Sequence, residues 1–317
     1  MNGQKRLRVL VLFSGGLDSM LTAEILKAQD FDVTGLVFTG YFFDALKAIE
    51  SAEKIGIKLI QKDISEEHLK IVKDPKHGHG KGMNPCIDCH ELMLLEAKKV
   101  FISGQYDILA TGEVLNQRPF SQNRSLFQKI EKDTKLEGKI LRPLSAGVLP
   151  KTIYEENGIV QRHWLYGINN KSRKKQIKLA KKFGIKEYPT PSGGCVLAEP
   201  LYAEKVRNLL QFNKKPTRLD IQLLKIGRHF WLEKKKVLYA HIVLGKNKEE
   251  NEFIVLSKRS SEIIVQRMDE KGPTALLIFK RAGKQKKEIV INEARKLIWR
   301  YSGKKPISYE ELEYAER

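Results

Sequence analysis

Two adjacent glycines lie between hydroxyl and carboxylate side chains near the start of this 317-residue chain. The run reads Ser14-Gly15-Gly16-Leu17-Asp18-Ser19. Paired glycines let a backbone turn tightly and bring its N–H groups close to a bound anion. Serine hydroxyls can bond phosphate oxygens, and an aspartate carboxylate can hold Mg²⁺. The run therefore predicts a phosphate-binding turn, whereas two glycines alone would indicate only a turn.

The segments on either side predict a strand and a helix that would position this turn. Residues 9–13 form a continuous apolar run with the length of a buried parallel strand. Beyond the glycines, apolar residues recur at roughly helical spacing, at Leu17, Leu21, Ile25 and Leu26. The positive end of this helix would face the turn and attract an anion.

The three cysteines, Cys86, Cys89 and Cys195, are the other residues with chemical potential. Their odd number, without a recognisable signal peptide, indicates free thiols in a reducing cytoplasm rather than a disulfide framework. A proline before Cys86 and glycines before Cys195 predict that both lie on loops.

Four roles are open to these thiols. They could simply be small buried residues, or they could bind Zn²⁺ with His77, His79 or His90 as a fourth ligand. Three thiolates could also hold a [4Fe–4S] cluster and leave one iron open for sulfide. In the fourth role, one cysteine carries a persulfide that another resolves.

Strands and helices are expected to alternate through the first half of the chain. We expect strands at residues 33–38, 58–64 and 107–111, and helices at residues 42–55 and 88–101. This alternation predicts an α/β fold with a doubly wound parallel sheet, which binds ligands at the carboxyl ends of its strands. Ser14, Phe38 and Thr111 all lie at such ends, and we expect them to share one site.

The pattern SGGxDS at residues 14–19 resembles the loop of the PP-loop ATP pyrophosphatase family. Combined with a C-x-x-C pair and a distant third cysteine, it makes the chain similar to the tRNA thiouridine synthetases of that family. Residues 84–86 are similar to the tRNA 2-thiouridylases. Residues 111–117 and 142–144 are similar to the tRNA 4-thiouridine synthetases.

This resemblance implies an enzyme that splits ATP into AMP and pyrophosphate and leaves AMP on a uracil carbonyl oxygen of tRNA. A sulfur nucleophile then displaces AMP to give thiouridine. The chain lacks the G-x-x-x-x-G-K-S/T loop of kinases, and we therefore expect adenylation rather than phosphorylation. The expected catalytic residues are Asp18, with Mg²⁺ near it, Cys86 and Cys195. The expected ATP-binding residues are Ser14, Gly15, Gly16, Asp18, Ser19, Phe38, Thr111, Gly112, Glu113 and Gln117.

The resemblance also implies a [4Fe–4S] cluster on Cys86, Cys89 and Cys195, with Zn²⁺ or no metal as alternatives. No sulfurtransferase domain is recognisable, and we expect free sulfide or a separate carrier protein to donate sulfur. That expectation favours the cluster over a persulfide relay. Two other functions stay open: a ligase of the same family that uses a nitrogen nucleophile, and a non-catalytic RNA-binding factor.

A second, smaller and basic α+β domain is expected after a linker at residues 213–216. This places a catalytic domain at residues 1–212 and an RNA-binding domain at residues 217–317, which resembles that of ribosome-quality-control (NFACT-type) proteins at residues 227–230 and 245–251. The net charge of +20 and the lysine clusters at residues 234–236 and 280–287 indicate tRNA as the partner. No run is long enough for a membrane span, and we expect a cytoplasmic protein.

Overall fold

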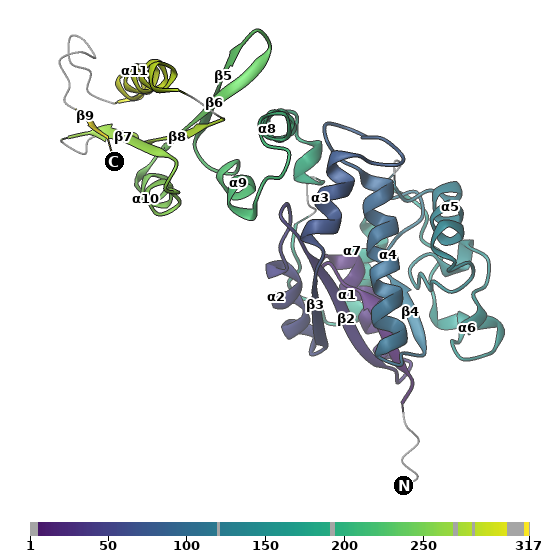
Figure 1. The fold of residues 1–317 in the computed structure, drawn as a ribbon. Helices are drawn as coiled ribbons and strands as arrows, with labels where there is room; N and C mark the ends of the chain where they lie inside the picture. Colours follow the sequence, from purple (N-terminus) through teal and green to yellow (C-terminus); the bar gives the residue numbers. More distant parts are fainter. Residues whose placement is uncertain are drawn as a thin grey trace. The chain divides into compact units, whose positions relative to one another are not determined.

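The computed structural model describes residues 6–118, 121–190, 194–268, 272–280, 283–302 and 314–316 (Figure 1). The chain forms two compact units. The first comprises Met1–Gly80 and Pro85–Gly194, and the second comprises residues 81–84 and 195–317. The division after Gly194 precedes the boundary expected at residues 212–217. Residues 191–193, next to Cys195, and residues 281–282 of the second lysine cluster lie outside the described residues.

A four-stranded parallel sheet forms the centre of the first unit, which confirms the predicted α/β class. Its strand order is β3-β2-β1-β4, and β1 pairs with β2 on one side and with β4 on the other. The strands are β1 (Arg8–Leu12), β2 (Asp32–Thr39), β3 (Lys58–Asp63) and β4 (Ile108–Thr111). Because the order reverses beside β1, the carboxyl ends of β1 and β4 lie next to each other, where such sheets bind ligands.

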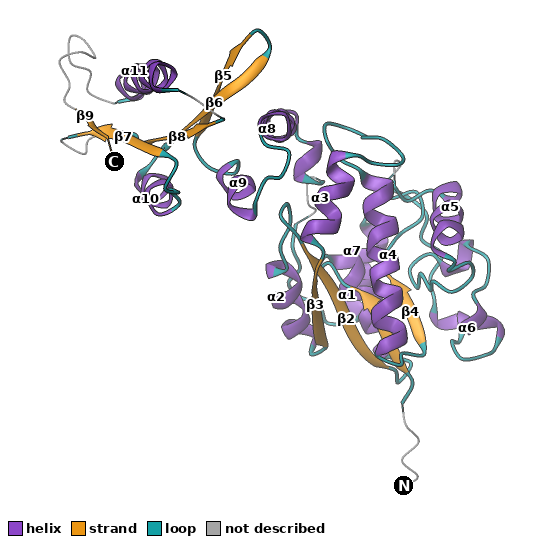
Figure 2. Cartoon of the chain, in the orientation of Figure 1, coloured by secondary structure: helices purple, strands orange, loops and turns teal. Residues whose placement is uncertain are grey.

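Helices cover both faces of this sheet, and the alternation of strand side chains explains the two layers (Figure 2). Val9 and Val11 pack with α1 (Leu17–Lys27), α2 (Leu46–Ile55) and α7 (Lys174–Lys182). Leu10 points to the opposite face, toward α4 (Cys86–Ser103) and α5 (Arg124–Thr134). Two further helices are α3 (Ser65–Lys73), which packs beside α4, and the short α6 (Ile153–Glu156).

Two helix starts differ from the expectation. Helix α2 begins at Leu46 instead of residue 42, because Gly40 and Phe43 form an isolated antiparallel bridge and Asp44 accepts a hydrogen bond from the Leu46 N–H. The expected loop at Cys86 is wrong, because α4 begins at that residue. Pro85 lacks an N–H and suits a helix start. Both cysteines of the pair therefore lie in the first turn of a helix.

The second unit contains a five-stranded antiparallel sheet with the order β5-β6-β8-β7-β9. Helix α11 packs on one face of this sheet, and helices α9 and α10 pack on the other. Its strands are β5 (Arg228–Lys234), β6 (Val237–Leu244), β7 (Ile263–Arg267), β8 (Ala275–Phe279) and β9 (Tyr314–Glu316). Its helices are α8 (Pro200–Phe212), α9 (Arg218–Leu223), α10 (Lys248–Leu256) and α11 (Lys284–Tyr301). This confirms the smaller α+β unit. Within the described ranges, no helix is long and apolar enough to cross a membrane.

Two glycines allow the segments after β1 and β4 to approach their neighbours. Gly15 has a φ of +73°, and a Cβ added there would lie 2.4 Å from the Lys47 carbonyl oxygen. A Cβ on Gly112 would lie 2.8 Å from the backbone of Ser19 in α1. In both cases backbone atoms set the limit, and they cannot rotate away as a side chain could.

We predict that Gly112→Ala lowers the free energy of unfolding by about 1–3 kcal/mol, because the new methyl group must push α1 away from β4. Urea melts would measure the loss. Gly167→Ala is the matched control in the same unit, since its Cβ would meet nothing closer than 3.5 Å. Equal stability losses in the two variants would contradict the close approach at Gly112.

Candidate active site

A cavity of about 520 Å³ lies at the carboxyl ends of β1 and β4. Every predicted ATP-binding residue except Gly15 and Phe38 lines it. Lining residues from the prediction are Ser14, Gly16, Asp18, Ser19, Thr111, Gly112, Glu113 and Gln117. The further lining residues that carry charge or polarity are Lys47, His90, Arg118, Gln122, Arg173 and Thr190. Two segments far apart in the sequence thus build one pocket.

Gly15 and Phe38 lie beside the cavity and shape its surroundings. The Gly15 carbonyl accepts a hydrogen bond of 2.8 Å from the buried Ser51 hydroxyl, which fixes the turn against α2. Phe38 is 6% exposed and packs with Leu94 of α4 in the hydrophobic layer on the opposite face from α1. The strand's alternation carries its ring away from the glycine turn.

The amino end of α1 faces the cavity without a capping side chain. Gly16 is the residue before its first turn, and no side chain bonds the first backbone N–H groups. Those N–H groups have no partner within the helix and make the end of α1 a site for an anion. The Ser19 hydroxyl donates to the Gly16 carbonyl at 2.8 Å and thereby stiffens the turn. Ser14 accepts a long hydrogen bond of 3.4 Å from the Gly16 N–H.

Asp18 has one carboxylate oxygen that is held and one that is free. Its Oδ2 accepts a hydrogen bond of 2.6 Å from the Gln117 amide and lies 3.5 Å from the Arg173 guanidinium. Gln117 is itself held at 2.7 Å by the amide of the fully buried Gln176. The Oδ1 of Asp18 is buried without a hydrogen-bond partner among the described residues. A buried carboxylate oxygen without a partner suits a divalent cation such as Mg²⁺.

Cations outnumber carboxylates on the cavity wall. Lys47, Arg118 and Arg173 line it together with Asp18 and Glu113. This balance and the end of α1 would favour a polyanion such as the triphosphate of ATP.

Cys86, His90 and Glu113 form a chain of contacts that reaches the cavity wall. His90 follows Cys86 by one helical turn of α4, and the two side chains hydrogen-bond. The Nδ1 of His90 lies 3.3 Å from Oε1 of Glu113, which follows β4. His90 and Glu113 both line the cavity. This arrangement places a thiol, an imidazole and a carboxylate in series.

The contacts among Cys86, His90 and Glu113 favour ionisation of the Cys86 thiol. Burial disfavours the imidazolium, but the hydrogen bonds to Cys86 and Glu113 outweigh it and raise the pKa of His90 to about 10. Burial also opposes ionisation of Cys86, yet the hydrogen bond and charge of His90 hold the pKa of the thiol below its usual value. The start of α4 stabilises a negative charge there as well. Cys86 therefore ionises more readily than an ordinary thiol, and the thiolate is the nucleophilic form.

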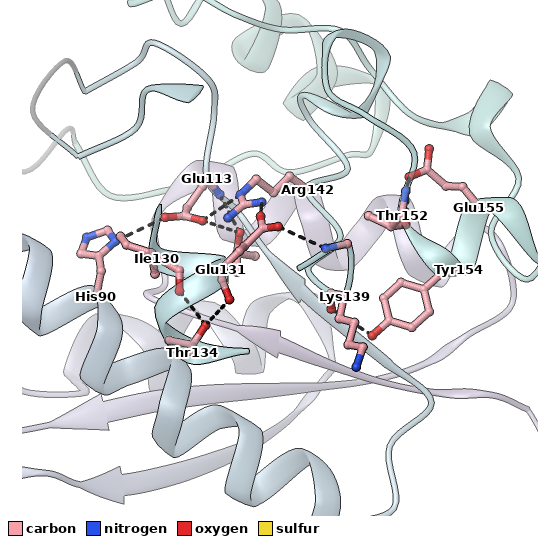
Figure 3. A network of polar contacts seen from close by, with 12 residues as sticks. His90, Glu113, Ile130, Glu131, Thr134, Lys139, Arg142, Thr152, Tyr154 and Glu155 are labelled. Atoms are coloured by element: carbon pink, nitrogen blue, oxygen red, sulfur yellow. Dashed lines mark hydrogen bonds and ion pairs between the residues drawn. The ribbon is translucent and has the colours of Figure 1, made fainter. Parts of the chain in front are cut away.

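Arg142 completes the network behind Glu113 (Figure 3). Its Nε donates to Oε2 of Glu113 at 3.0 Å, and its NH1 donates to Glu131 of α5. Thr111 donates to the same Oε2 at 3.0 Å. Burial alone would raise the pKa of Glu113, but the charge of Arg142 and the hydrogen bond with His90 lower it to about 2. Glu113 is therefore a fixed carboxylate.

The three cysteines do not lie in one unit. Cys86 and Cys89 are half-buried in the first turn of α4, and Cys195 is exposed on the second unit. Among the histidines considered for zinc, His90 contacts Cys86. His79 instead lies 2.8 Å from the Val72 carbonyl oxygen, and His77 faces Asp88 and Glu91.

Several residues of the site were absent from the predicted set. These are Lys47, His90 as a partner of Cys86, Arg118, Arg142, Arg173 and Gln176. Two of them carried a signal in the sequence: His90, whose spacing of four from Cys86 puts both on one helix face, and Arg142, which lies in the segment similar to the tRNA 4-thiouridine synthetases. The others reach the site through tertiary contacts.

Comparison with known proteins supports a relation to tRNA-modifying enzymes. The family model described as the tRNA methyl transferase HUP domain matches residues 7–182. The tRNA-specific 2-thiouridylase MnmA of Bartonella henselae is 30% identical over 148 residues, which cover 40% of this chain and 35% of that protein. MnmA 1 of Clostridium tetani is 28% identical over 197 residues, with 56% and 50% covered. MnmA of Sulfurimonas denitrificans is 25% identical over 253 residues, with 76% and 67% covered. The chain thus spans between a third and a half of the first two relatives.

We predict that the alkylation of Cys86 by iodoacetamide has its pH midpoint below the ordinary thiol value of about 8.5, because His90 stabilises the thiolate. In His90→Gln the midpoint rises, since burial then acts without the imidazolium. Peptide mass spectrometry across pH would follow this one residue. His163→Gln, a histidine outside the cavity lining, is the control. An unshifted midpoint in His90→Gln would contradict the ion pair.

Proposed function

Because the chain belongs to the tRNA methyl transferase HUP domain family, we propose that it is an ATP-dependent tRNA sulfurtransferase that forms thiouridine. The observation that carries the proposal is the meeting of two sites at one cavity. One wall has the α1 terminus and Asp18, and the other has His90, which contacts Cys86. The names of the relatives support uridine position 2 as the site of thiolation.

ATP would bind with its phosphates at the amino end of α1. The first-turn N–H groups, Lys47 and Arg173 would take the negative charge of the phosphates. Mg²⁺, held through the free oxygen of Asp18, would neutralise charge on the leaving pyrophosphate. A uracil carbonyl oxygen then attacks the α-phosphorus, and the bond to pyrophosphate breaks.

Sulfur transfer would follow at the same carbon. A sulfur nucleophile attacks the ring carbon that carries the adenylate, and the bond to oxygen breaks to release AMP. The lowered pKa of the Cys86 thiol supports this residue as the site that handles sulfur. A ligase that uses a nitrogen nucleophile would need no thiolate beside the cavity, so Cys86 favours sulfur over nitrogen.

The other thiols and the sulfur source complete the proposal. Cys89 and Cys195 are the candidate partners that resolve a persulfide on Cys86. A [4Fe–4S] cluster on Cys86, Cys89 and Cys195 remains a prediction. Iron and acid-labile sulfide analysis of anaerobically purified protein would test it, and four irons per chain would replace the persulfide route. The proposed donor for a persulfide on Cys86 is a carrier protein that itself holds a persulfide, because its outer sulfur passes to the Cys86 thiolate while the carrier's own thiolate leaves. Free sulfide would be the donor only for the cluster, since it cannot form a persulfide without an oxidant. The three cysteines form no disulfide, which suits a cytoplasmic location.

The second unit is the part of the chain that we propose binds tRNA. Three lysines, Lys284, Lys286 and Lys287, lie in the first turn of α11. Cations at a helix amino end repel the helix dipole, and an RNA phosphate bound there would relieve that repulsion. Residues 201–317 carry 27 Lys and Arg against 15 Asp and Glu, which adds a general attraction for tRNA.

We predict that Asp18→Asn reduces tRNA-dependent release of AMP and pyrophosphate by about 100-fold or more, because the amide cannot neutralise Mg²⁺. The melting temperature should stay close to that of the wild type, since the amide keeps the carboxylate's shape. Asp30→Asn is the control, as Asp30 is an exposed carboxylate paired with Arg6. Full pyrophosphate release by Asp18→Asn would remove Asp18 from the mechanism.

We predict that changing Lys284, Lys286 and Lys287 together to Gln weakens tRNA binding. The magnitude of the slope of log affinity against log salt should fall by about 2–3, since each of the three lost phosphate contacts removes about 0.7–0.9 of a unit. Affinity for ATP should stay unchanged, because the cavity lies in the first unit. Filter binding at several salt concentrations measures the slope, and an unchanged slope would exclude the start of α11 from the tRNA interface.

A further inference from the structure

Arg142 is a buried cation that does not line the cavity. Its side chain is 5% exposed, and its guanidinium stacks over the Phe127 ring at 4.0 Å. It lies between two carboxylates from different parts of the fold, Glu113 after β4 and Glu131 on α5 (Figure 3). It reaches Cys86 only through Glu113 and His90.

Stability alone is a weak reason for this triad. Removing an arginine and two carboxylates from water is costly, and packed apolar residues often stabilise a fold equally well. A planar guanidinium instead provides geometry, because its donors have fixed directions. Nε meets Glu113 while NH1 meets Glu131, so the two carboxylates are held in one orientation.

This orientation decides which oxygen of Glu113 meets His90. Oε2 is occupied twice, by Arg142 and by the Thr111 hydroxyl, each at 3.0 Å. Oε1 is left for Nδ1 of His90 at 3.3 Å. The contact of Nδ1 with Glu113 orients the imidazole ring of His90, which also hydrogen-bonds to Cys86.

We propose that Arg142 is a positioning residue for sulfur transfer: anchored by Glu131, it holds Glu113 so that His90 is aimed at Cys86. The inference rests on the proposed function for the step that Arg142 serves, but the contact chain exists without tRNA or ATP. Arg142 acts through two other residues and touches neither the α1 terminus nor Asp18. Its loss therefore affects the sulfur step and spares adenylation.

The test compares Arg142→Lys with Arg162→Lys. Lysine keeps the charge but loses the fork that reaches two carboxylates. Arg162 is the matched control, because it also pairs with a buried glutamate, Glu155, and lies outside the cavity lining. Three quantities are measured: tRNA-dependent pyrophosphate release in a single turnover, which reports adenylation, thionucleoside formation, and the rate of Cys86 alkylation at pH 7.

In Arg142→Lys we expect Cys86 alkylation and thionucleoside formation to fall about 10-fold, as misplaced reacting groups do. Single-turnover pyrophosphate release and the KM for ATP should stay within about two-fold of the wild type, as should every value for Arg162→Lys. Free guanidinium at millimolar concentration should restore alkylation in Arg142→Ala. A merely structural residue would give no such rescue.

Wild-type alkylation and thiolation in Arg142→Lys would overturn the inference, even if the melting temperature fell. If Arg142→Lys does not fold, Glu131→Gln supplies the test, because the amide keeps the contact with the Gly138 N–H and weakens the anchor on Arg142. Alkylation slowed in Glu131→Gln supports the inference, and an unchanged rate overturns it. Failure of the wild-type protein to thiolate tRNA would refute the proposed function alone, since alkylation still reports on Cys86.

Discussion

The parallel pairing of β1 with β4 is the constraint on which the site depends. It sets Leu12 opposite Thr111 and joins segments that are almost a hundred residues apart. Helix α1, which follows β1, carries Asp18 in its first turn, and the segment after β4 carries Glu113. A glycine at position 112 lets the second segment touch the backbone of α1. Without this pairing, neither the anion site nor the support of His90 would exist.

Glu113 links the two halves of the cavity electrostatically. The predicted role for this residue was ATP binding, and it does line the pocket. Its oxygens are nevertheless shared among Thr111, Arg142 and His90. Arg142 thus neutralises the Glu113 carboxylate at Oε2, and Oε1 of the same carboxylate pairs with the His90 imidazolium. Such a group supports sulfur chemistry more directly than it supports binding of a nucleotide.

Local sequence patterns predicted the fold well, because each strand or helix is specified by the spacing of apolar residues within its own segment. The apolar run before the glycines and the helical spacing after them specify β1 and α1, and alternating segments specify the parallel sheet. The helix start at Cys86 was missed because Pro85 was taken as a sign of a loop, although proline also suits the start of a helix. The resemblance marked residues 142–144, but the contacts of Arg142 with Glu113 and Glu131 could not be predicted, since only the tertiary fold forms them. Phe38 was predicted to bind ATP because it lies near the carboxyl end of β2. Side chains alternate between the two faces of a strand, however, and the Phe38 ring packs in the hydrophobic core.

Formation of a thiolated nucleoside in tRNA is the central claim, and nucleoside mass spectrometry tests it most directly. Bulk tRNA would be compared between cells with and without the gene, and between cells complemented with the wild type and with Cys86→Ser. The account predicts that one thiouridine derivative disappears without the gene and returns only with the wild-type protein. A thionucleoside profile unchanged by deletion of the gene would contradict it.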